Sequence, residues 1–239
     1  MTIATRALEY SDDDVSLTGF LAADGEQRDP RPGILLVHGG AGLDDHAREQ
    51  AARYAELGYV VLACDMFGPG VAGDRERVVA RLRQLRDDPQ LLCRRALAGL
   101  TALRALPEVD GRAAAVGFCF GGMTVLTLAR RGGDLAGVIS MHGSLATTSP
   151  AEPATITAKV LACHGARDPH VPQADVTAFM DEMATGGADW QLIAYGSAMH
   201  GFTHAHAVPG AIPGVAYDAP TDRRSFAAAR QFLTELFPT

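Results

Sequence analysis

Short apolar runs recur along the chain, separated by longer stretches in which apolar and polar residues follow a helical period. The short runs are typical of buried strands and the longer stretches of amphipathic helices. The expected strands cover residues 34–37, 59–63, 113–116, 137–140, 160–163 and 192–195. The expected helices cover residues 45–57, 75–106 with a break near Pro89, 122–131, 173–185 and 221–237. This alternation predicts an α/β fold with a mostly parallel central sheet and helices on both faces.

The remaining segments show neither pattern. Residues 67–74 and 196–220 are rich in turn-forming residues, and we expect both to be loops over the sheet rather than linkers. The segments around Leu8 and over residues 16–22 are compatible with a flanking hairpin. A chain of 239 residues can be one α/β domain, because such domains often reach about 250 residues. We therefore expect a single domain over residues 1–239.

Charge and hydropathy narrow the possible partners. A formal net charge of -7 and a pI near 5.6 argue against binding to the phosphate backbone of nucleic acids, and no basic block suggests an anionic membrane. The N-terminus lacks the features of a secretory signal, and no apolar run approaches the roughly 18 residues needed to span a bilayer. We expect a cytoplasmic protein that acts on a small molecule, as a monomer or homodimer.

The cysteines and histidines do not predict a disulfide framework or a metal site. Cys64, Cys93 and Cys163 are widely spaced in apolar or helical stretches, where packing as small apolar side chains accounts for them. The histidines other than His200 show no metal-ligand spacing apart from His204-x-His206; they are His38, His46, His142, His164, His170, His204 and His206. We expect no metal and no cofactor.

Cys119 needs a different explanation. It lies in the sequence GFCFGG, between the predicted strand 113–116 and a helix-forming run. A small-x-nucleophile-x-small sequence at such a junction makes a tight turn that exposes the central side chain. Gly117 and Gly121 allow the close backbone approach, and the N-terminus of the following helix favours the thiolate. The alternative is a glycine-rich turn around a buried cysteine.

A nucleophile predicts two partners, and both follow later strands. Asp168 comes after the strand 160–163, and His200 comes after the strand 192–195. In an open α/β sheet, ligands bind beyond the carboxyl ends of the strands. Taken singly, Asp168 could be a turn or capping residue and His200 a surface histidine. Together with Cys119 they follow the order nucleophile, acid, histidine of the α/β-hydrolases. His200 would exchange the proton of Cys119, and Asp168 would fix the tautomer of His200.

A family resemblance extends over nearly the whole chain. It is carried by the stretches LLVHGGAGL, AELGYVVLACDMFG, AVGFCFGG, AGVISMHGSL, CHGARDPHVP, YGSAMHGFT and VAYDAPTDRRSF. With these stretches the sequence resembles the dienelactone hydrolase family of α/β-hydrolases. The resemblance implies hydrolysis of a carboxylic ester or lactone by a Cys119, His200 and Asp168 triad through an acyl-cysteine intermediate, without a cofactor. It also implies an oxyanion hole made by the backbone N–H groups of Gly40 and Phe120.

Two positions depart from the family pattern. Members typically carry a glutamate directly before the first oxyanion-hole residue, where this chain has Gly39, and the glutamate is thought to help generate the thiolate. His38 could substitute in part or could brace the loop. Enzymes acting on dienelactone use arginines to hold the substrate carboxylate, one of them four residues after the catalytic histidine, where this chain has His204. Arg75, Arg77, Arg81 and Arg83 could supply another clamp or form a solvated helix face.

The sequence does not identify the substrate. His38, Gly39, Phe67, Phe202 and His204 are the candidate substrate-binding residues, each with an ordinary structural alternative. The leading hypothesis is a cysteine-dependent hydrolase of a small carboxylic ester or lactone. A thioesterase or promiscuous esterase with the same triad is a close alternative. A non-catalytic member of the family that binds a small molecule is the third.

Overall fold

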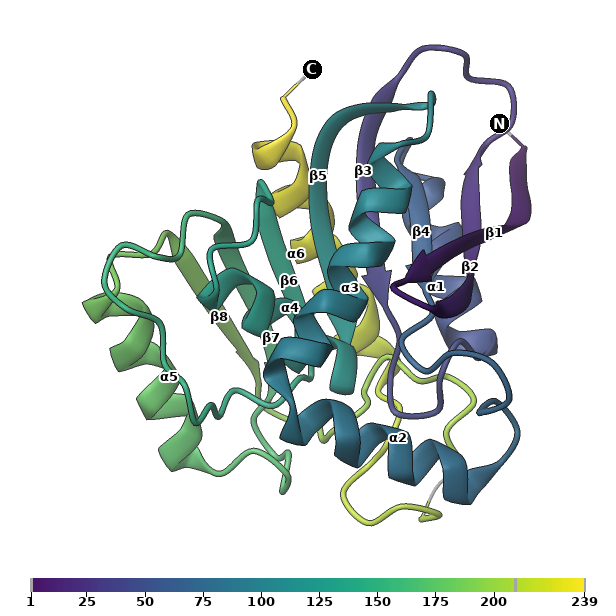
Figure 1. The fold of residues 1–239 in the computed structure, drawn as a ribbon. Helices are drawn as coiled ribbons and strands as arrows, with labels where there is room; N and C mark the ends of the chain where they lie inside the picture. The colour runs from purple at the N-terminus through teal and green to yellow at the C-terminus, as the bar shows by residue number, and fades with distance from the viewer. Residues whose placement is uncertain (1, 209, 239) are drawn as a thin grey trace. The chain divides into compact units, whose positions relative to one another are not determined.

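The computed structural model describes residues 2–208 and 210–238. The chain forms two compact units, Met1–Ala115 and Val116–Thr239. Figure 1 labels the helices and strands of both units. Within the residues that the structure describes, no helix is both long and apolar enough to cross a membrane.

The first unit contains a mixed sheet with the strand order β1-β2-β4-β3. Its strands are β1 (Ile3–Asp12), β2 (Val15–Asp24), β3 (Arg31–Val37) and β4 (Val60–Cys64). The predicted N-terminal hairpin is present and pairs over its full length, from Ile3 opposite Asp24 to Asp12 opposite Val15. β3 and β4 are parallel and fully apolar in their centres, because helices cover this part of the sheet on both sides.

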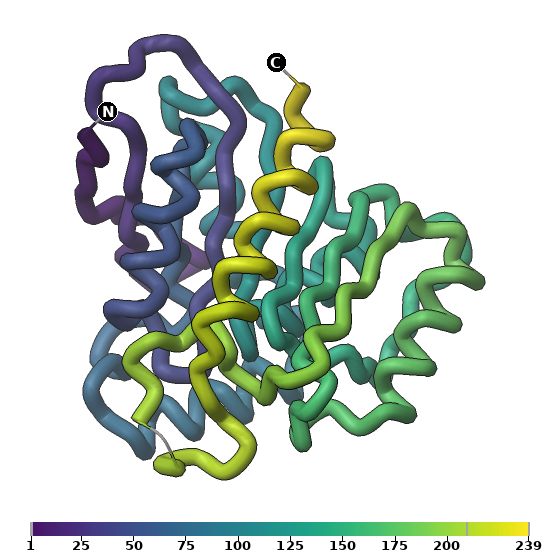
Figure 2. The backbone as a smooth tube through the Cα atoms, turned by 180° about the vertical axis from the view of Figure 1, so that it is seen from behind, coloured from purple at the N-terminus to yellow at the C-terminus, as the bar shows by residue number. Residues whose placement is uncertain are grey.

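Three helices belong to the first unit: α1 (Asp45–Ala55), α2 (Arg75–Asp87) and α3 (Pro89–Arg104). α1 and α3 lie on opposite faces of β3 and β4, as both views show (Figures 1 and 2). The predicted break near Pro89 is confirmed. Asp88 ends α2, and its carboxylate accepts hydrogen bonds from the N–H groups of Gln90 and Leu91 at the start of α3.

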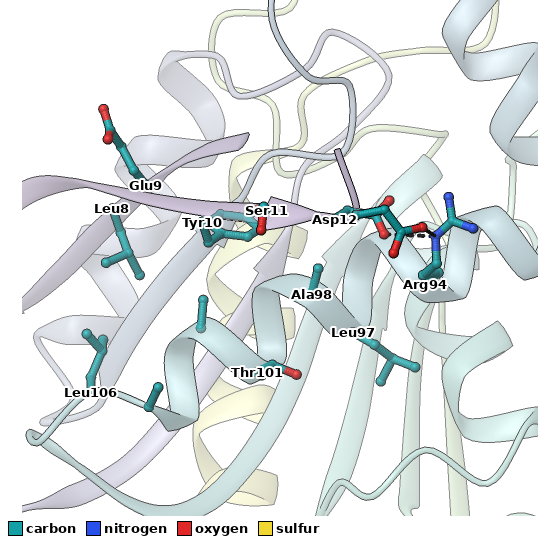
Figure 3. A pocket seen from close by; sticks show the side chains of 13 residues that line it. Leu8, Glu9, Tyr10, Ser11, Asp12, Arg94, Leu97, Ala98, Thr101 and Leu106 are labelled. Atoms are coloured by element: carbon teal, nitrogen blue, oxygen red, sulfur yellow. Dashed lines mark hydrogen bonds and ion pairs between the residues drawn. The ribbon is translucent and has the colours of Figure 1, made fainter. Parts of the chain in front are cut away.

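The outer strand β1 and helix α3 enclose a surface cavity of about 690 Å³. Figure 3 shows Leu8, Leu97 and Leu106 around its apolar part and the ion pair of Asp12 with Arg94 at one end. Asp12 also accepts a hydrogen bond of 2.7 Å from the buried Arg95. None of the residues predicted to form a functional site lines this cavity.

The second unit contains the parallel strands β6 (Gly137–Met141), β7 (Lys159–Gly165) and β8 (Trp190–Tyr195). β5 (Val109–Phe118) passes from the first unit into the second and ends directly before Cys119. The helices of this unit are α4 (Phe120–Arg130), α5 (Gln173–Thr185) and α6 (Ala219–Leu236). α4 and α6 cover opposite faces of β6, and Phe232 and Leu236 of α6 contact the strand at Gly137.

Every predicted strand and helix is present, with some shifts at the ends. α6 begins two residues earlier than expected, because Asp218 caps it and Pro220 fits its first turn. α4 begins at Phe120 rather than Gly122, because the turn is completed at Cys119, which is the N-cap residue of the helix. β5 is longer than predicted, because the exposed residues Asp110, Gly111 and Arg112 separate its buried first residue, Val109, from the apolar run.

Candidate active site

The turn between β5 and α4 presents Cys119 at the start of a helix. Cys119 has φ 53° and ψ -110°, a left-handed backbone that residues other than glycine rarely adopt. Its N–H donates a hydrogen bond of 2.9 Å to the carbonyl of Met141 at the end of β6. Cys119 is half-buried, whereas the other three cysteines are buried. The structure therefore exposes the one thiol that the sequence singled out.

This turn depends on two glycines. A Cβ atom on Gly117 would overlap the carbonyl group of Gly121 four residues later. A Cβ atom on Gly122 would lie 2.7 Å from Oγ of Ser140 and 2.8 Å from Cα of Gly143. Gly117 was predicted from the motif. The requirement at Gly122 comes from packing against the segment after β6, which the sequence did not reveal.

The loops after β7 and β8 carry Asp168 and His200, and backbone contacts hold these loops together. The N–H of Ala166 donates to the carbonyl of Tyr195, and the N–H of Arg167 donates to the carbonyl of Ala198. Gly165 permits this approach, because a Cβ atom there would lie 2.7 Å from the carbonyl oxygen of Ala198.

The backbone of His200 is fixed on its other side as well. Its N–H donates to the carbonyl of Gly214, and its carbonyl accepts from the N–H of Ala216. The loop that carries His200 is therefore anchored both to the loop after β7 and to the segment before α6.

The three predicted side chains meet. Nδ1 of His200 lies 2.8 Å from Oδ2 of Asp168, and Nε2 of His200 lies 3.0 Å from Sγ of Cys119. Asp168 is buried, and its other oxygen accepts a hydrogen bond of 2.8 Å from the N–H of His170. An imidazole in this position can hold a proton toward the sulfur while the carboxylate fixes its tautomer.

The electrostatics of the site favour a charged imidazole. Burial disfavours the charged form of His200, but the hydrogen bonds to Asp168 and Cys119 outweigh burial and raise its pKa to about 10. Burial likewise acts to raise the pKa of Asp168, yet its interactions with His200 and the His170 N–H hold that pKa below its ordinary value. Both shifts favour a protonated His200 beside an ionised Asp168.

Three further histidines lie around His200, and none of them was predicted to have a role in the site. The ring of His142 lies 5.4 Å from the His200 ring, and the ring of His170 lies 5.3 Å from it. Burial lowers the pKa of His164, which lies close enough to feel the charges of Asp168 and His200. All three follow or end a strand at its carboxyl end, as Asp168 and His200 do, and that position is the signal by which they could have been found.

The predicted loop residues of the first unit have different environments. His38 is fully buried, with Nδ1 donating to the carbonyl of Gly39 and Nε2 accepting from the N–H of Met66. Burial lowers the pKa of His38. Its ring contacts the buried Phe67 edge to face, at 4.6 Å between ring centres. This packing favours the bracing role for His38. Gly40, the predicted oxyanion donor, is half-buried in the same loop.

The predicted residues of the second unit also differ in exposure. Phe120 is the first residue of α4, so its N–H belongs to the helix N-terminus beside Cys119. Phe202 is fully buried and packs edge to face on His142, while His204 is half-buried.

The arginines predicted as a substrate clamp or a solvated face lie on α2 of the first unit. Arg75, Arg77 and Arg83 are exposed, and Arg81 is half-buried. Arg77 pairs with Asp74 and donates to the carbonyl of Gly70. Burial lowers the pKa of Arg81. The three exposed side chains match the solvated-face alternative.

Known proteins share this architecture. A dienelactone hydrolase-like promiscuous phosphotriesterase from metagenomic libraries superposes with a TM-score of 0.93 at 39% identity, over 99% of this chain and 100% of that chain. A dienelactone hydrolase from Anabaena variabilis superposes with a TM-score of 0.69 at 20% identity, over 99% of this chain and 97% of that one, which shows the fold alone. An uncharacterized protein of Caenorhabditis elegans is 38% identical over 146 residues, 59% of this chain and 90% of that protein.

The strands, the turn at Cys119 and these superpositions define an α/β-hydrolase fold, as the sequence predicted. The sequence model of the dienelactone hydrolase family matches residues 17–237. The chain belongs to the dienelactone hydrolase family and is an ester hydrolase.

Proposed function

We propose that the protein hydrolyses small carboxylic esters or lactones with Cys119 as nucleophile, His200 as acid and base, and Asp168 as the residue that orients His200. One observation carries this proposal: His200 reaches the sulfur of Cys119 with one ring nitrogen, at 3.0 Å, and Asp168 with the other, at 2.8 Å. The raised pKa of His200, about 10, supports a resting pair of thiolate and imidazolium at neutral pH.

In the first half of the reaction, the thiolate of Cys119 adds to the carbonyl carbon of the ester. The C–O bond then breaks, and Nε2 of His200 gives its proton to the leaving alkoxide, which departs as an alcohol. The acyl group is left on Cys119 as a thioester.

In the second half, a water oxygen attacks the thioester carbonyl while neutral His200 takes one water proton. The C–S bond breaks, the carboxylic acid leaves, and the pair of thiolate and imidazolium is restored. Asp168 keeps Nδ1 protonated throughout, so that Nε2 faces the sulfur and the reacting oxygens.

The negative charge that develops on the carbonyl oxygen needs hydrogen-bond donors. We assign this role to the N–H groups of Phe120 and Gly40. Phe120 fits the assignment because its N–H lies at the N-terminus of α4, next to Cys119. Gly40 is assigned from the family resemblance. Losing one such donor typically costs about 100- to 1,000-fold in rate.

A panel of aryl and alkyl esters, lactones and thioesters tests the proposal with the wild type and the Cys119→Ala variant. We expect hydrolysis by the wild type only. With a slowly deacylated ester, intact-protein mass spectrometry should show an acyl adduct on the wild type and none on C119A. Ester hydrolysis that C119A retains would reject Cys119 as the nucleophile. The relative rates of esters and thioesters separate a carboxylic ester hydrolase from a thioesterase, which are two of the three hypotheses that the sequence leaves open.

A second candidate activity is the hydrolysis of phosphotriesters. It is favoured by the 39% identity and TM-score of 0.93 with a promiscuous phosphotriesterase of the same family. Adding a neutral aryl dialkyl phosphate to the substrate panel tests it. Turnover that disappears in C119A would assign this reaction to the same sulfur.

The expected cellular setting follows from the chemistry. We propose a small-molecule substrate, no nucleic-acid partner and a cytoplasmic location, where the thiol of Cys119 stays reduced. A single-domain organisation and a monomeric or homodimeric state are likewise part of the proposal.

A further inference from the structure

We propose that His142 is a positioning residue that sets Cys119, Asp168 and His200 in register, through its hydrogen bond to Thr203. The proposal deepens the proposed function, because it concerns the geometry of that same site. It rests on the bonds that residues 141 and 142 make to three separate segments of the second unit.

The backbone at this position is strained. His142 follows β6 directly, is fully buried and has φ 42°. Only a few per cent of residues other than glycine adopt a positive φ, and such residues persist where the surrounding structure enforces them. A left-handed residue at the carboxyl end of a strand is therefore held there by its contacts. Three bonds of this segment lead to the segments that carry the three predicted catalytic residues.

Two backbone bonds tie this position to the segments of Cys119 and Asp168. The carbonyl of Met141 accepts the N–H of Cys119 at 2.9 Å. The N–H of His142 donates to the carbonyl of Cys163 at 2.9 Å. Cys163 lies in β7, whose end leads into the loop that carries Asp168.

The side chain of His142 makes the third connection. Its Nε2 is hydrogen-bonded to Oγ1 of Thr203 at 2.8 Å, and both side chains are buried. Thr203 lies three residues after His200 in the same loop. The His142 ring also packs edge to face on His200, at 5.4 Å, and on Phe202, at 4.9 Å between ring centres. The bond and the two ring contacts together fix the position of the His200 loop relative to the end of β6.

Loss of the bond to Thr203 would release one side of the His200 loop. The contact between His200 and Cys119 would then lengthen and weaken while the fold persisted. Within the described part of the second unit, the titratable groups that face His200 are Cys119 from the turn before α4, Asp168 and His170 from the loop after β7, His164 near the end of β7, and His142. A small displacement of His200 should thus appear in the pH dependence of Cys119 reactivity as well as in turnover.

Three variants separate positioning from simple packing. Thr203→Val removes the hydroxyl and keeps the shape. His142→Phe keeps an aromatic ring and loses the bond, whereas His142→Gln keeps an amide where Nε2 lies. Thr127→Val is the control, because it removes a threonine hydrogen bond of 2.9 Å in α4 that does not touch the site.

Each variant is measured for kcat and KM on the best ester, for the rate of Cys119 alkylation against pH, and for thermal unfolding. For T203V and H142F we expect kcat to fall about 10- to 100-fold, the size of effect that small misplacements produce. KM should stay within about twofold, and the alkylation midpoint should move to higher pH. H142Q should recover much of the loss, and T127V should match the wild type.

Unchanged kcat and an unchanged alkylation profile in folded T203V and H142F would overturn the proposal, even if their unfolding temperature fell. Failure of H142Q to recover more activity than H142F would also count against the hydrogen bond. Should H142F not fold, T203V decides alone, since it adds no volume. If the wild type hydrolyses no ester, the proposed function fails, while the alkylation profiles still decide the positioning role.

Discussion

Nε2 of His200 lies 3.0 Å from Sγ of Cys119, although 81 positions separate the two residues in the chain. At this distance the imidazole can hold the thiol proton, and the raised pKa of His200 favours that arrangement. We predict that Cys119 is alkylated with an apparent pKa well below the free value of about 8.5, without the glutamate that Gly39 replaces. The measurement is the rate of iodoacetamide labelling against pH.

The other cysteines provide the contrast for this measurement. Burial raises the pKa of Cys64 and raises that of Cys163 to about 12, so these thiols should stay unlabelled in the folded protein. C119S should abolish fast labelling, and H200A should move the midpoint up toward the free value. If the alkylation midpoint of the wild type lies at or above that of H200A, the resting pair of Cys119 thiolate and His200 imidazolium is rejected. Formation of the thiolate only when substrate binds would then be the remaining mechanism.

The pH at which activity falls on the alkaline side should report the pKa of His200. The imidazolium must give a proton to the leaving group, and the folded pKa of about 10 lies above the ordinary 6.5. The imidazolium is therefore fully present below the ordinary value and is lost as pH rises through the folded one. We predict that kcat/KM for an alkali-stable ester falls only near pH 10.

Asp168→Asn tests the origin of that limit. The substitution removes the carboxylate that raises the pKa of His200, so the alkaline limb should move to lower pH. Turnover at neutral pH should drop by up to about 10⁴-fold, the loss seen when such a carboxylate becomes an amide. A limb that keeps its position in D168N would mean that another group sets it.

The sequence predicted the strands and helices well, and it predicted that Cys119, Asp168 and His200 lie together, for a physical reason. Apolar strands such as 160–163 are buried on both faces and have no polar alternative, so their positions are unambiguous. Cys119 and Asp168 follow buried strands, and His200 follows the partly exposed edge strand β8. The carboxyl ends of parallel strands lie at one edge of a sheet.

What the sequence could not predict depends on contacts between segments. His142 has no motif of its own, and its bond to Thr203 exists only once β6 and the His200 loop are folded together. The need for glycine at Gly122 arises from Ser140 and Gly143, about twenty positions away. His38 could be interpreted as a substrate contact or as a brace, and only its complete burial favours the brace.

Gly117 should be the least replaceable residue of the turn. A Cβ atom there would overlap the backbone carbonyl of Gly121, which cannot move without dislodging the start of α4. We predict that Gly117→Ala lowers the free energy of unfolding by about 3 kcal/mol or more, in the range of severe backbone and overpacking effects. Urea unfolding measures the change, and fast Cys119 labelling should disappear with it.

Gly196→Ala is the matched control for that variant. A methyl group on Gly196 would extend into open space, and the backbone there has no positive φ, so alanine should be tolerated within about 0.5 kcal/mol. Equal stability of G117A and G196A would show that the turn can open to accept a side chain.

The last prediction concerns the ion pair between α4 and α5. Arg130 donates from Nε and Nη2 to the carboxylate of Glu182 at 2.8–3.1 Å, and both side chains are more than nine-tenths buried. Glu182 also accepts from the N–H of Ala151, and Arg130 donates to the carbonyl of Leu145. The pair therefore holds the loop after β6 against α5 as well as joining the two helices.

Arg130→Met should be strongly destabilising, because it leaves the Glu182 carboxylate buried without its partner. Breaking one side of a buried pair typically costs about 3–5 kcal/mol. Lys159→Met is the control: Lys159 pairs with Asp189 at 2.6 Å, but the two side chains are 46% and 68% exposed, and such pairs are worth at most about 1 kcal/mol. Urea unfolding of the two variants compares them directly. A loss in R130M no larger than in K159M would mean that water reaches Glu182 readily, and that the loop after β6 is held to α5 by packing instead.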